Sequence, residues 1–334
     1  MPQTADPTRD QIQKLLQERI LRKQTVGIIA GIIDQHGTRC ISAGTSGNAA
    51  RPFVDEQTLF EIGSITKLFT AAALADALAR GIVALDDPLS KFLSVPPDGI
   101  GDRTLKELAT HTSGLPRLPS GFTWWSNLLL HLKNPYANYS QRNLEAYLGT
   151  LKGKAFARGK FLYSNLGAGL LGNILATREH TDFATLISQR VTGPLGLTHT
   201  YFHVPPQEQS FVAQPHNRLL RPTPVWIMTA LSGAGGLLSC MTDMLRFASC
   251  ALAGTPPLFP SMLQPLADTN RAGRQVGLGW MLRTSDRYQM AWHNGGTGGS
   301  RSFLGVDLVR RRAIVVLSNS SLAVDQLAVD VLLG

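Results

Sequence analysis

The stretch EIGSITKLF, residues 61 to 69, decides how this chain is interpreted, because it places a serine three residues before a lysine where a helical pattern begins. In a helix that starts at or just before Ser64, Ser64 and Lys67 lie on one face and approach each other. The positive end of the helix dipole stabilises an oxyanion at this position. A serine hydroxyl also needs a neighbouring base, which a desolvated lysine can be. The spacing therefore indicates a catalytic pair.

The spacing alone is weak evidence, because 22 serines and 9 lysines in 334 residues give about 0.6 such spacings by chance. Ser64 has a purely structural alternative as a helix N-cap. Two further polar motifs follow in order along the chain. Residues 163–165 read YSN just before a helical pattern, and residues 293–295 read HNG on a strand-like segment that runs into a glycine-rich turn. Three ordered motifs favour a catalytic site.

Each of the two later motifs also has a structural interpretation. Tyr163 can be a core aromatic, Asn165 can be an N-cap, and His293 can be a hydrogen-bonded strand histidine. In isolation each of these interpretations is the better one. The catalytic interpretation depends on the three motifs occurring together.

Periodicity around these motifs predicts strands and helices at both ends of the chain, with helices between. A helix at about 8–22 precedes two strand patterns at 25–34 and 38–46, which a turn at 35–37 joins. Helical patterns occupy much of 104–250, and strand patterns return from about 275. We expect an α/β domain, with an antiparallel sheet flanked by helices, from 1–80 and 270–334, and a mainly helical domain inserted at 81–269. The active site is expected where the two domains meet.

Composition excludes several classes of protein. Hydrophobic residues make up 43% of the chain and charged residues 16%, which is enough for a large core and argues against disorder. The apolar stretch VGIIAGII at 26–33 falls well short of the ~20 residues of a membrane span. No signal peptide is visible, which predicts a cytoplasmic protein as written, or a periplasmic or secreted one if the chain is trimmed. Three cysteines fit neither a disulfide framework nor a zinc site and are expected to be buried thiols: Cys40, Cys240 and Cys250.

The net charge of +9 raises the possibility of nucleic-acid binding. The densest basic run, 310–312, lies between two strand patterns and is expected in a solvated turn. No nucleic-acid motif or basic face with interleaved aromatics accompanies it. The charge supports a mild preference for anionic ligands, and the expected partner is a small molecule rather than a nucleic acid.

With all three motifs in order, the chain resembles the class C β-lactamase-like serine hydrolases. These include class C β-lactamases, D-alanyl-D-alanine carboxypeptidases and other penicillin-binding proteins, D-aminopeptidases and β-lactamase-like esterases. The likeness covers roughly residues 20 to 320, and a β-lactamase/transpeptidase-like fold is what it implies. The matching blocks include LATHTSGLP (108–116), FLYSNLGAGLLG (161–172), VTGPLGLTHTYF (191–202) and GAGGLLSCMTDMLRFA (233–248).

The resemblance implies a mechanism through an acyl-enzyme on Ser64, with no metal or organic cofactor. Lys67 and Tyr163 would exchange the serine proton, and Asn165 would hold Lys67 and the substrate. The backbone N–H groups of Ser64 and Gly296 would form the oxyanion hole. His293 and Gly295, from the third motif, would line the substrate site.

The chain departs from class C β-lactamases in its third motif, which is usually Lys-Thr-Gly. No lysine follows Lys160, and His293 takes that place, as in carboxypeptidases, aminopeptidases and many esterases of the family. Anchoring a substrate carboxylate would then depend on the protonation or hydrogen bonding of His293, so β-lactam hydrolysis is expected to be slow if it occurs.

The segment 117–140 is a second departure and is interpreted as a lid over the cleft, with Trp124 and Trp125 as an apolar wall. Packing of these tryptophans within the helical domain is an equal alternative, and the same ambiguity applies to Trp226. His199 and His203 are four residues apart, but no third ligand supports a metal site. The absence of a G-x-S-x-G elbow disfavours an α/β-hydrolase esterase.

The expected function is hydrolysis of a carboxylic ester, a D-amino-acid amide or peptide, or a β-lactam. An acyltransferase or cyclase of the same fold would use an amine or alcohol in place of water. A β-lactam sensor would be acylated without turnover. Ser64, Lys67, Tyr163 and Asn165 together favour turnover, because a sensor has no need to retain all four.

Overall fold

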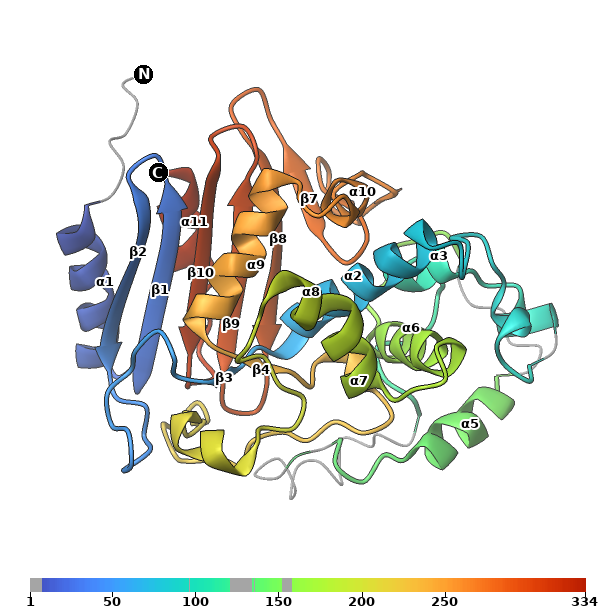
Figure 1. The fold of residues 1–334 in the computed structure, drawn as a ribbon, viewed down its shortest axis with the longest axis horizontal. Coiled ribbons are helices and arrows are strands. Elements are labelled where there is room, and N and C mark those ends of the chain that lie inside the picture. Colours follow the sequence, from blue (N-terminus) through green and yellow to red (C-terminus); the bar gives the residue numbers. More distant parts are fainter. Residues whose placement is uncertain (1–7, 96, 121–133, 135, 152–157) are drawn as a thin grey trace.

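The computed structural model describes residues 8–95, 97–120, 134, 136–151 and 158–334, and its centre is one antiparallel sheet. The strand order is β2-β1-β10-β9-β8-β7-β6-β5 (Figure 1). The N-terminal strands therefore join the C-terminal ones through β1 and β10, which pair from Ile28↔Ser318 to Ile33↔Ala313. The strands are β1 (Gly27–Asp34), β2 (Gly37–Gly44), β5 (Ala267–Asp268), β6 (Gln275–Val276), β7 (Met281–Thr284), β8 (Gln289–Gly296), β9 (Arg301–Asp307) and β10 (Arg312–Ser318).

Helices cover both faces of this sheet. On one face α1 (Arg9–Leu21) packs against β1 and β2, and α11 (Asp325–Leu333) packs against β9 and β10. On the other face α9 (Met241–Ala253) packs against β1, β9 and β10, and Figure 1 shows α9 in front of the sheet with α11 behind it.

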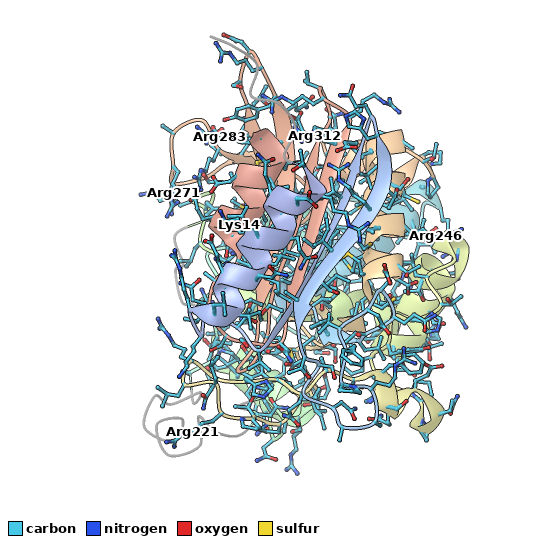
Figure 2. All side chains as sticks on the ribbon, turned by 90° about the vertical axis from the view of Figure 1, so that its left-hand side faces the viewer. Lys14, Arg221, Arg246, Arg271, Arg283 and Arg312 are labelled. Carbon is cyan, nitrogen blue, oxygen red and sulfur yellow. The ribbon has the colours of Figure 1, made fainter. Side chains whose placement is uncertain are left out.

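The side chains of β1 alternate between two hydrophobic clusters, as the period of a strand requires. Ile28 and Ile32 belong to the cluster under α1 and α11, whereas Ile29 belongs to the main core. This alternation explains why β1 is apolar from Gly27 to Ile33: both of its faces are covered (Figure 2).

The remaining helices form a second region beside the sheet. Its centre is α2 (Thr66–Ala79), in which 11 of the 14 residues are buried, as the apolar pattern on all sides of this helix predicts. The other α-helices among the described residues there are α3 (Leu105–Ala109), α5 (Gln141–Gly149), α6 (Asn165–Arg178), α7 (Phe183–Ile187), α8 (Gly193–Leu195) and α10 (Leu258–Met262). The short strand β3 (Phe60–Glu61) precedes α2 in the chain. It pairs with the short strand β4 (Leu238–Ser239).

The structure confirms the expected antiparallel sheet flanked by helices, with both ends of the chain in it. The boundaries 1–80, 81–269 and 270–334 remain a prediction; α9, which falls in the middle range, packs on the sheet. Of the strand patterns expected from about residue 275, the stretch GLGWMLR (277–283) contributes only its last three residues to β7, because Gly279 has a φ of +74°, which a strand does not accommodate. Among the described helices, none is both long and apolar enough to span a membrane.

Candidate active site

Ser64 and Lys67 lie in contact where α2 begins. Ser64 is half-buried in a 3₁₀ turn (Gly63–Ile65) that leads directly into α2. The N-cap of α2 is Ile65, which makes no side-chain cap, so the alternative role of Ser64 as an N-cap is wrong. The Lys67 Nζ lies 3.1 Å from the Ser64 Oγ. The contact between Ser64 and Lys67 that the spacing predicted is therefore present.

Lys67 is 3% exposed and has two further hydrogen-bond acceptors. Its Nζ donates to Asn165 Oδ1 at 2.9 Å and to the Ala234 carbonyl at 2.6 Å. Both acceptors are neutral, and within the described part of the chain no carboxylate lies within 4.0 Å of this ammonium. Burial, and then the nearby Arg117 cation, hold the pKa of Lys67 well below its usual range. The site therefore favours a neutral amine.

Asn165 is available to Lys67 because a neighbouring residue caps α6. Ser164 Oγ accepts from the Gly167 N–H at 2.8 Å, so Ser164 is the N-cap and that alternative for Asn165 is wrong. The Asn165 side chain instead accepts from Lys67 and donates through Nδ2 to the Tyr136 hydroxyl at 3.2 Å. The Asn165 amide thus connects Lys67 to Tyr136 in the helical region.

Tyr163 lies beside this pair, and its hydroxyl is hydrogen-bonded to Ser64. The Lys67 Nζ is 4.9 Å from the centroid of its ring, and the Arg117 guanidinium carbon is 5.4 Å from it. Burial raises the pKa of Tyr163 to about 12, against the opposing effects of the Ser64 hydrogen bond and the Arg117 cation. Tyr163 is therefore a neutral phenol near pH 7.

His293, on β8, is 1% exposed and neutral. Its Nδ1 lies 2.7 Å from the Asn294 carbonyl, which can only accept, so the proton is on Nδ1. Burial, and then the charge that Lys67 carries when it is protonated, lower the pKa of His293 to about 3. Its Nε2 is a buried acceptor without a partner among the described residues. A cationic His293 is thus disfavoured.

Gly295 and Gly296 bring β8 against the segment that carries Ser64. A Cβ on Gly295 would lie 2.0 Å from the Ile62 carbonyl oxygen, and one on Gly63 would lie 2.5 Å from the Gly296 nitrogen. Ser302 Oγ, on β9, donates to the same Ile62 carbonyl at 2.7 Å. These contacts place the backbone amide of Gly296 next to the turn of Ser64.

Glu61 and His111 are buried beside the site, and the sequence analysis assigned a role to neither of them. Glu61, 4% exposed, accepts hydrogen bonds from the hydroxyls of Thr297 and Ser300, each at 2.8 Å, and from the Trp226 N–H at 2.7 Å. Burial raises the pKa of this carboxyl. Glu61 thereby fixes the turn that follows β8.

The second missed residue is His111, which has a φ of +58°. Its Nδ1 accepts from the Ser164 N–H at 3.2 Å, and its ring is 4.5 Å from that of Tyr163. Burial, and then the charge that Lys67 carries when it is protonated, hold the pKa of His111 well below its usual range. Its presence in the LATHTSGLP block is the only signal in the sequence that could have indicated it.

The tryptophans predicted near the cleft have different outcomes. Trp226 packs against the main core with its ring 5.3 Å from that of Tyr136. Trp124 and Trp125 lie outside the described residues, so their role as a wall of the cleft stays a prediction.

His199 lies near Cys240 and Asp243, with one ligand-type atom of each within 4.8 Å of the others. Asp243 already accepts from the His199 N–H at 2.8 Å and from the Thr200 hydroxyl at 2.7 Å. Burial, and then the Asp243 carboxylate, raise the pKa of Cys240 to about 12, so the thiol stays protonated. These contacts are those of hydrogen-bonded side chains at the start of α9 rather than of a set of metal ligands.

The three cysteines differ in burial. Cys240 is buried as expected, whereas Cys40 and Cys250 are only half-buried.

Comparison with known proteins gives consistent matches. A family model described as Beta-lactamase matches residues 10–331. A Beta-lactamase of Pseudomonas fluorescens is 28% identical over 79% of this chain and 72% of its own length. The D-alanyl-D-alanine-carboxypeptidase/endopeptidase AmpH of Escherichia coli (strain K12) is 34% identical, over 60% of this chain but only half of its own length. The crystal structure of a class C beta lactamase from Rhodobacter sphaeroides superposes with a TM-score of 0.82 at 21% identity, over 96% of this chain and 98% of that one.

Proposed function

Because this chain belongs to the beta-lactamase family, we propose that it is a serine hydrolase that forms a covalent acyl-enzyme on Ser64. The substrate is a carboxylic ester, a D-amino-acid amide or peptide, or a β-lactam. One observation carries this proposal: a buried lysine without a carboxylate partner among the described residues lies 3.1 Å from a serine hydroxyl that Tyr163 also contacts.

Hydrogen bonding supports Lys67 as the base. A neutral lysine amine has two N–H donors and one lone pair. Asn165 Oδ1 and the Ala234 carbonyl accept two hydrogen bonds from Nζ, which leaves the lone pair for the third neighbour, the Ser64 hydroxyl. Ser64 then donates its proton to Lys67 as its Oγ attacks the carbonyl carbon.

Tyr163 is the proton relay to the leaving group. A phenol with a pKa of about 12 is protonated near neutral pH, so Tyr163 does not itself begin the reaction as a base. Its hydroxyl contacts Ser64 and its ring lies beside Lys67, so it can give its proton to the departing oxygen or nitrogen and be reprotonated from Lys67. Water attacks the acyl-enzyme in the second half of the reaction.

The backbone N–H groups of Ser64 and Gly296 form the oxyanion hole in this proposal. The close approach of Gly63 to Gly296 brings the two amides to one place, and Gly295 permits it because any side chain there would meet the Ile62 carbonyl. Donors fixed in this way stabilise the charge that develops in the transition state.

Neutral His293 favours esters or D-amino-acid amides over β-lactams. A lysine at this place would offer a cation to a carboxylate next to the scissile bond, whereas His293 offers an unprotonated acceptor. Hydrolysis of β-lactams is therefore expected to be slow.

Initial rates with a p-nitrophenyl ester, a D-alanyl p-nitroanilide and nitrocefin test the proposal on purified enzyme. Ser64→Ala is expected to lower kcat on the preferred substrate by about 10³-fold or more. Ser94→Ala, at an exposed position, is the matched control and is expected to keep the wild-type rate. Hydrolysis that survives in Ser64→Ala would overturn the assignment.

A further inference from the structure

His111 lies directly after α3, at a turn where its backbone is left-handed. Thr110 is the C-cap of α3, and His111 follows it with a φ of +58°. A left-handed residue often ends a helix in this way, and it is usually glycine because most side chains are strained in this conformation. His180 has the same place after α6, with a φ of +54° and an exposed side chain. The turn alone therefore does not explain why the His111 side chain is buried beside the catalytic residues.

Two hydrogen bonds join His111 to the residues on either side of Tyr163. The His111 carbonyl accepts from the Leu162 N–H at 2.7 Å, and the imidazole Nδ1 accepts from the Ser164 N–H at 3.2 Å. Residues 161–164, all of which the structure describes, belong to no helix or strand. The backbone around Tyr163 therefore depends on individual contacts such as these two rather than on a regular hydrogen-bond ladder.

The imidazole of His111 also packs against the ring of Tyr163. The two ring centroids are 4.5 Å apart, with an angle of 39° between the planes. The Phe161 ring meets the same imidazole edge-on, at 5.8 Å and 89°. Close packing of this kind restricts the directions in which a side chain can point. The His111 ring thus helps to direct the Tyr163 hydroxyl toward Ser64, to which it is hydrogen-bonded.

The hydrogen bond from Ser164 requires one form of the His111 imidazole. Because Nδ1 accepts from an N–H group, it carries no proton, and the proton is on Nε2. This is the opposite tautomer to that of His293, which has its proton on Nδ1. A cationic imidazole has a proton on both nitrogens and could not accept from Ser164. Neutral His111 is therefore the form that holds the segment of Tyr163.

The contact with Ser164 also bears on Asn165, because Ser164 is the N-cap of α6. The Ser164 Oγ donates to the Pro116 carbonyl at 2.7 Å, and the Asn165 N–H donates to the Arg117 carbonyl at 3.0 Å. These two acceptors are backbone groups. The His111 imidazole is the side-chain acceptor of this set, so it is the contact that a substitution can remove.

We propose that His111 is a positioning residue of the reaction, whose neutral imidazole holds Tyr163 where its phenol can protonate the leaving group. This inference rests on the proposed function and deepens it. His111 acts through Tyr163 and carries out no chemical step itself. Its loss should therefore slow most strongly the reactions in which the leaving group most needs a proton.

Two variants separate the roles of the acceptor and the ring. His111→Asn places Oδ1 where Nδ1 was, and asparagine tolerates a left-handed backbone. His111→Phe keeps a ring and removes the acceptor. Phenyl butyrate has a leaving group that needs protonation, whereas the leaving group of p-nitrophenyl butyrate departs readily as an anion. His111→Phe is expected to lower kcat/KM by about 100-fold for the phenyl ester and by about 10-fold at most for the p-nitrophenyl ester. His111→Asn should keep the wild-type ratio of the two esters.

His180→Phe is the matched control, because it makes the same replacement at the same place after a helix, with the side chain exposed. It should keep both rates. An equal loss for both esters in His111→Phe would indicate a general disturbance of the site and overturn the proposal. The same is true of a changed ratio in His111→Asn.

NMR spectroscopy separates this proposal from the proposed function, because it needs no turnover. The ¹⁵N signals of the His111 imidazole, assigned by their absence in His111→Asn, should show a proton on Nε2 and none on Nδ1. This result comes from wild type, so it stands even if His111→Phe does not fold. The Ser164 amide should exchange with D₂O about 10-fold or more faster in His111→Phe than in wild type, and at the wild-type rate in His111→Asn.

A proton on Nδ1 of His111, or unchanged exchange of the Ser164 amide in His111→Phe, would contradict the proposal even in an active hydrolase. Conversely, the expected tautomer and exchange rates in a protein that hydrolyses neither ester nor any other substrate would support the contact between His111 and Ser164. That outcome would refute the proposed function instead.

Discussion

At the scale of single residues, the sequence predicted the contact between Ser64 and Lys67 but not the residues that surround it. Ser64 and Lys67 are close in the chain, so helical spacing alone brings them together. Arg117, His111 and Glu61 reach the site from other segments, and periodicity cannot reveal which distant loops meet. The burial of Lys67 could be anticipated from its apolar helix, whereas its cationic neighbour could not.

Arg117→Gln is expected to move the acidic limb of the pH profile of kcat/KM to higher pH. In the proposed mechanism the active form has neutral Lys67, so activity is expected to fall as pH falls through the pKa of Lys67. The Arg117 cation helps to lower that pKa, so its removal raises the pKa and the enzyme needs a higher pH for the same activity. Arg142→Gln, at an exposed position on α5, serves as the control. An unmoved limb, or one displaced to lower pH, would refute the role of Arg117.

At the scale of secondary-structure elements, the site depends on contact between β8 and the turn that precedes α2. Strand β8 was predicted from its pattern, as was the glycine-rich turn after it. What the pattern could not reveal is that Gly295 lies against the Ile62 carbonyl, because this contact joins segments more than 200 residues apart. A helix or strand is thus predictable from the local sequence pattern. The contacts between distant segments are not predictable from that pattern.

Gly295→Ala is expected to lower the free energy of unfolding by about 2 kcal/mol or more, because its Cβ would lie 2.0 Å from the Ile62 oxygen. It should also lower kcat, since the Gly296 amide would be displaced from Ser64. Urea unfolding measures the first effect and ester hydrolysis the second.

Gly149→Ala is the matched control for this change. Gly149 ends α5 with a negative φ, and nothing lies within 4 Å of a Cβ added there. Its replacement should be neutral or slightly stabilising. If both variants unfold at the same urea concentration, the close packing of β8 does not matter to stability.

At the scale of the whole molecule, the fold joins its two ends in one sheet with a separate hydrophobic cluster on each face. Strand patterns at both ends, with helical patterns between, were enough to predict this architecture, and the family match confirms the resemblance. The exact domain limits were harder to predict, because a helix such as α9 has the same pattern whether it packs on a sheet or on other helices.

Leu16→Ala tests the independence of the two faces. Leu16 is fully buried in the cluster under α1, and the segment of Ser64 packs in the other cluster. The change should lower the free energy of unfolding by ~2–5 kcal/mol while kcat stays at the wild-type value under folding conditions. Leu21→Ala, at a position 80% exposed, should change neither. A large loss of kcat in folded Leu16→Ala would show that the faces are coupled.

The most direct test of the central claim is intact-protein mass spectrometry over time, on wild type and Ser64→Ala, with penicillin, nitrocefin and a p-nitrophenyl ester. The account predicts a transient adduct of the mass of the acyl group, with continuing product release, and neither in Ser64→Ala. A stable adduct without turnover would contradict a hydrolase and indicate a sensor. No adduct with any reagent, or an adduct that persists in Ser64→Ala, would contradict Ser64 as the nucleophile.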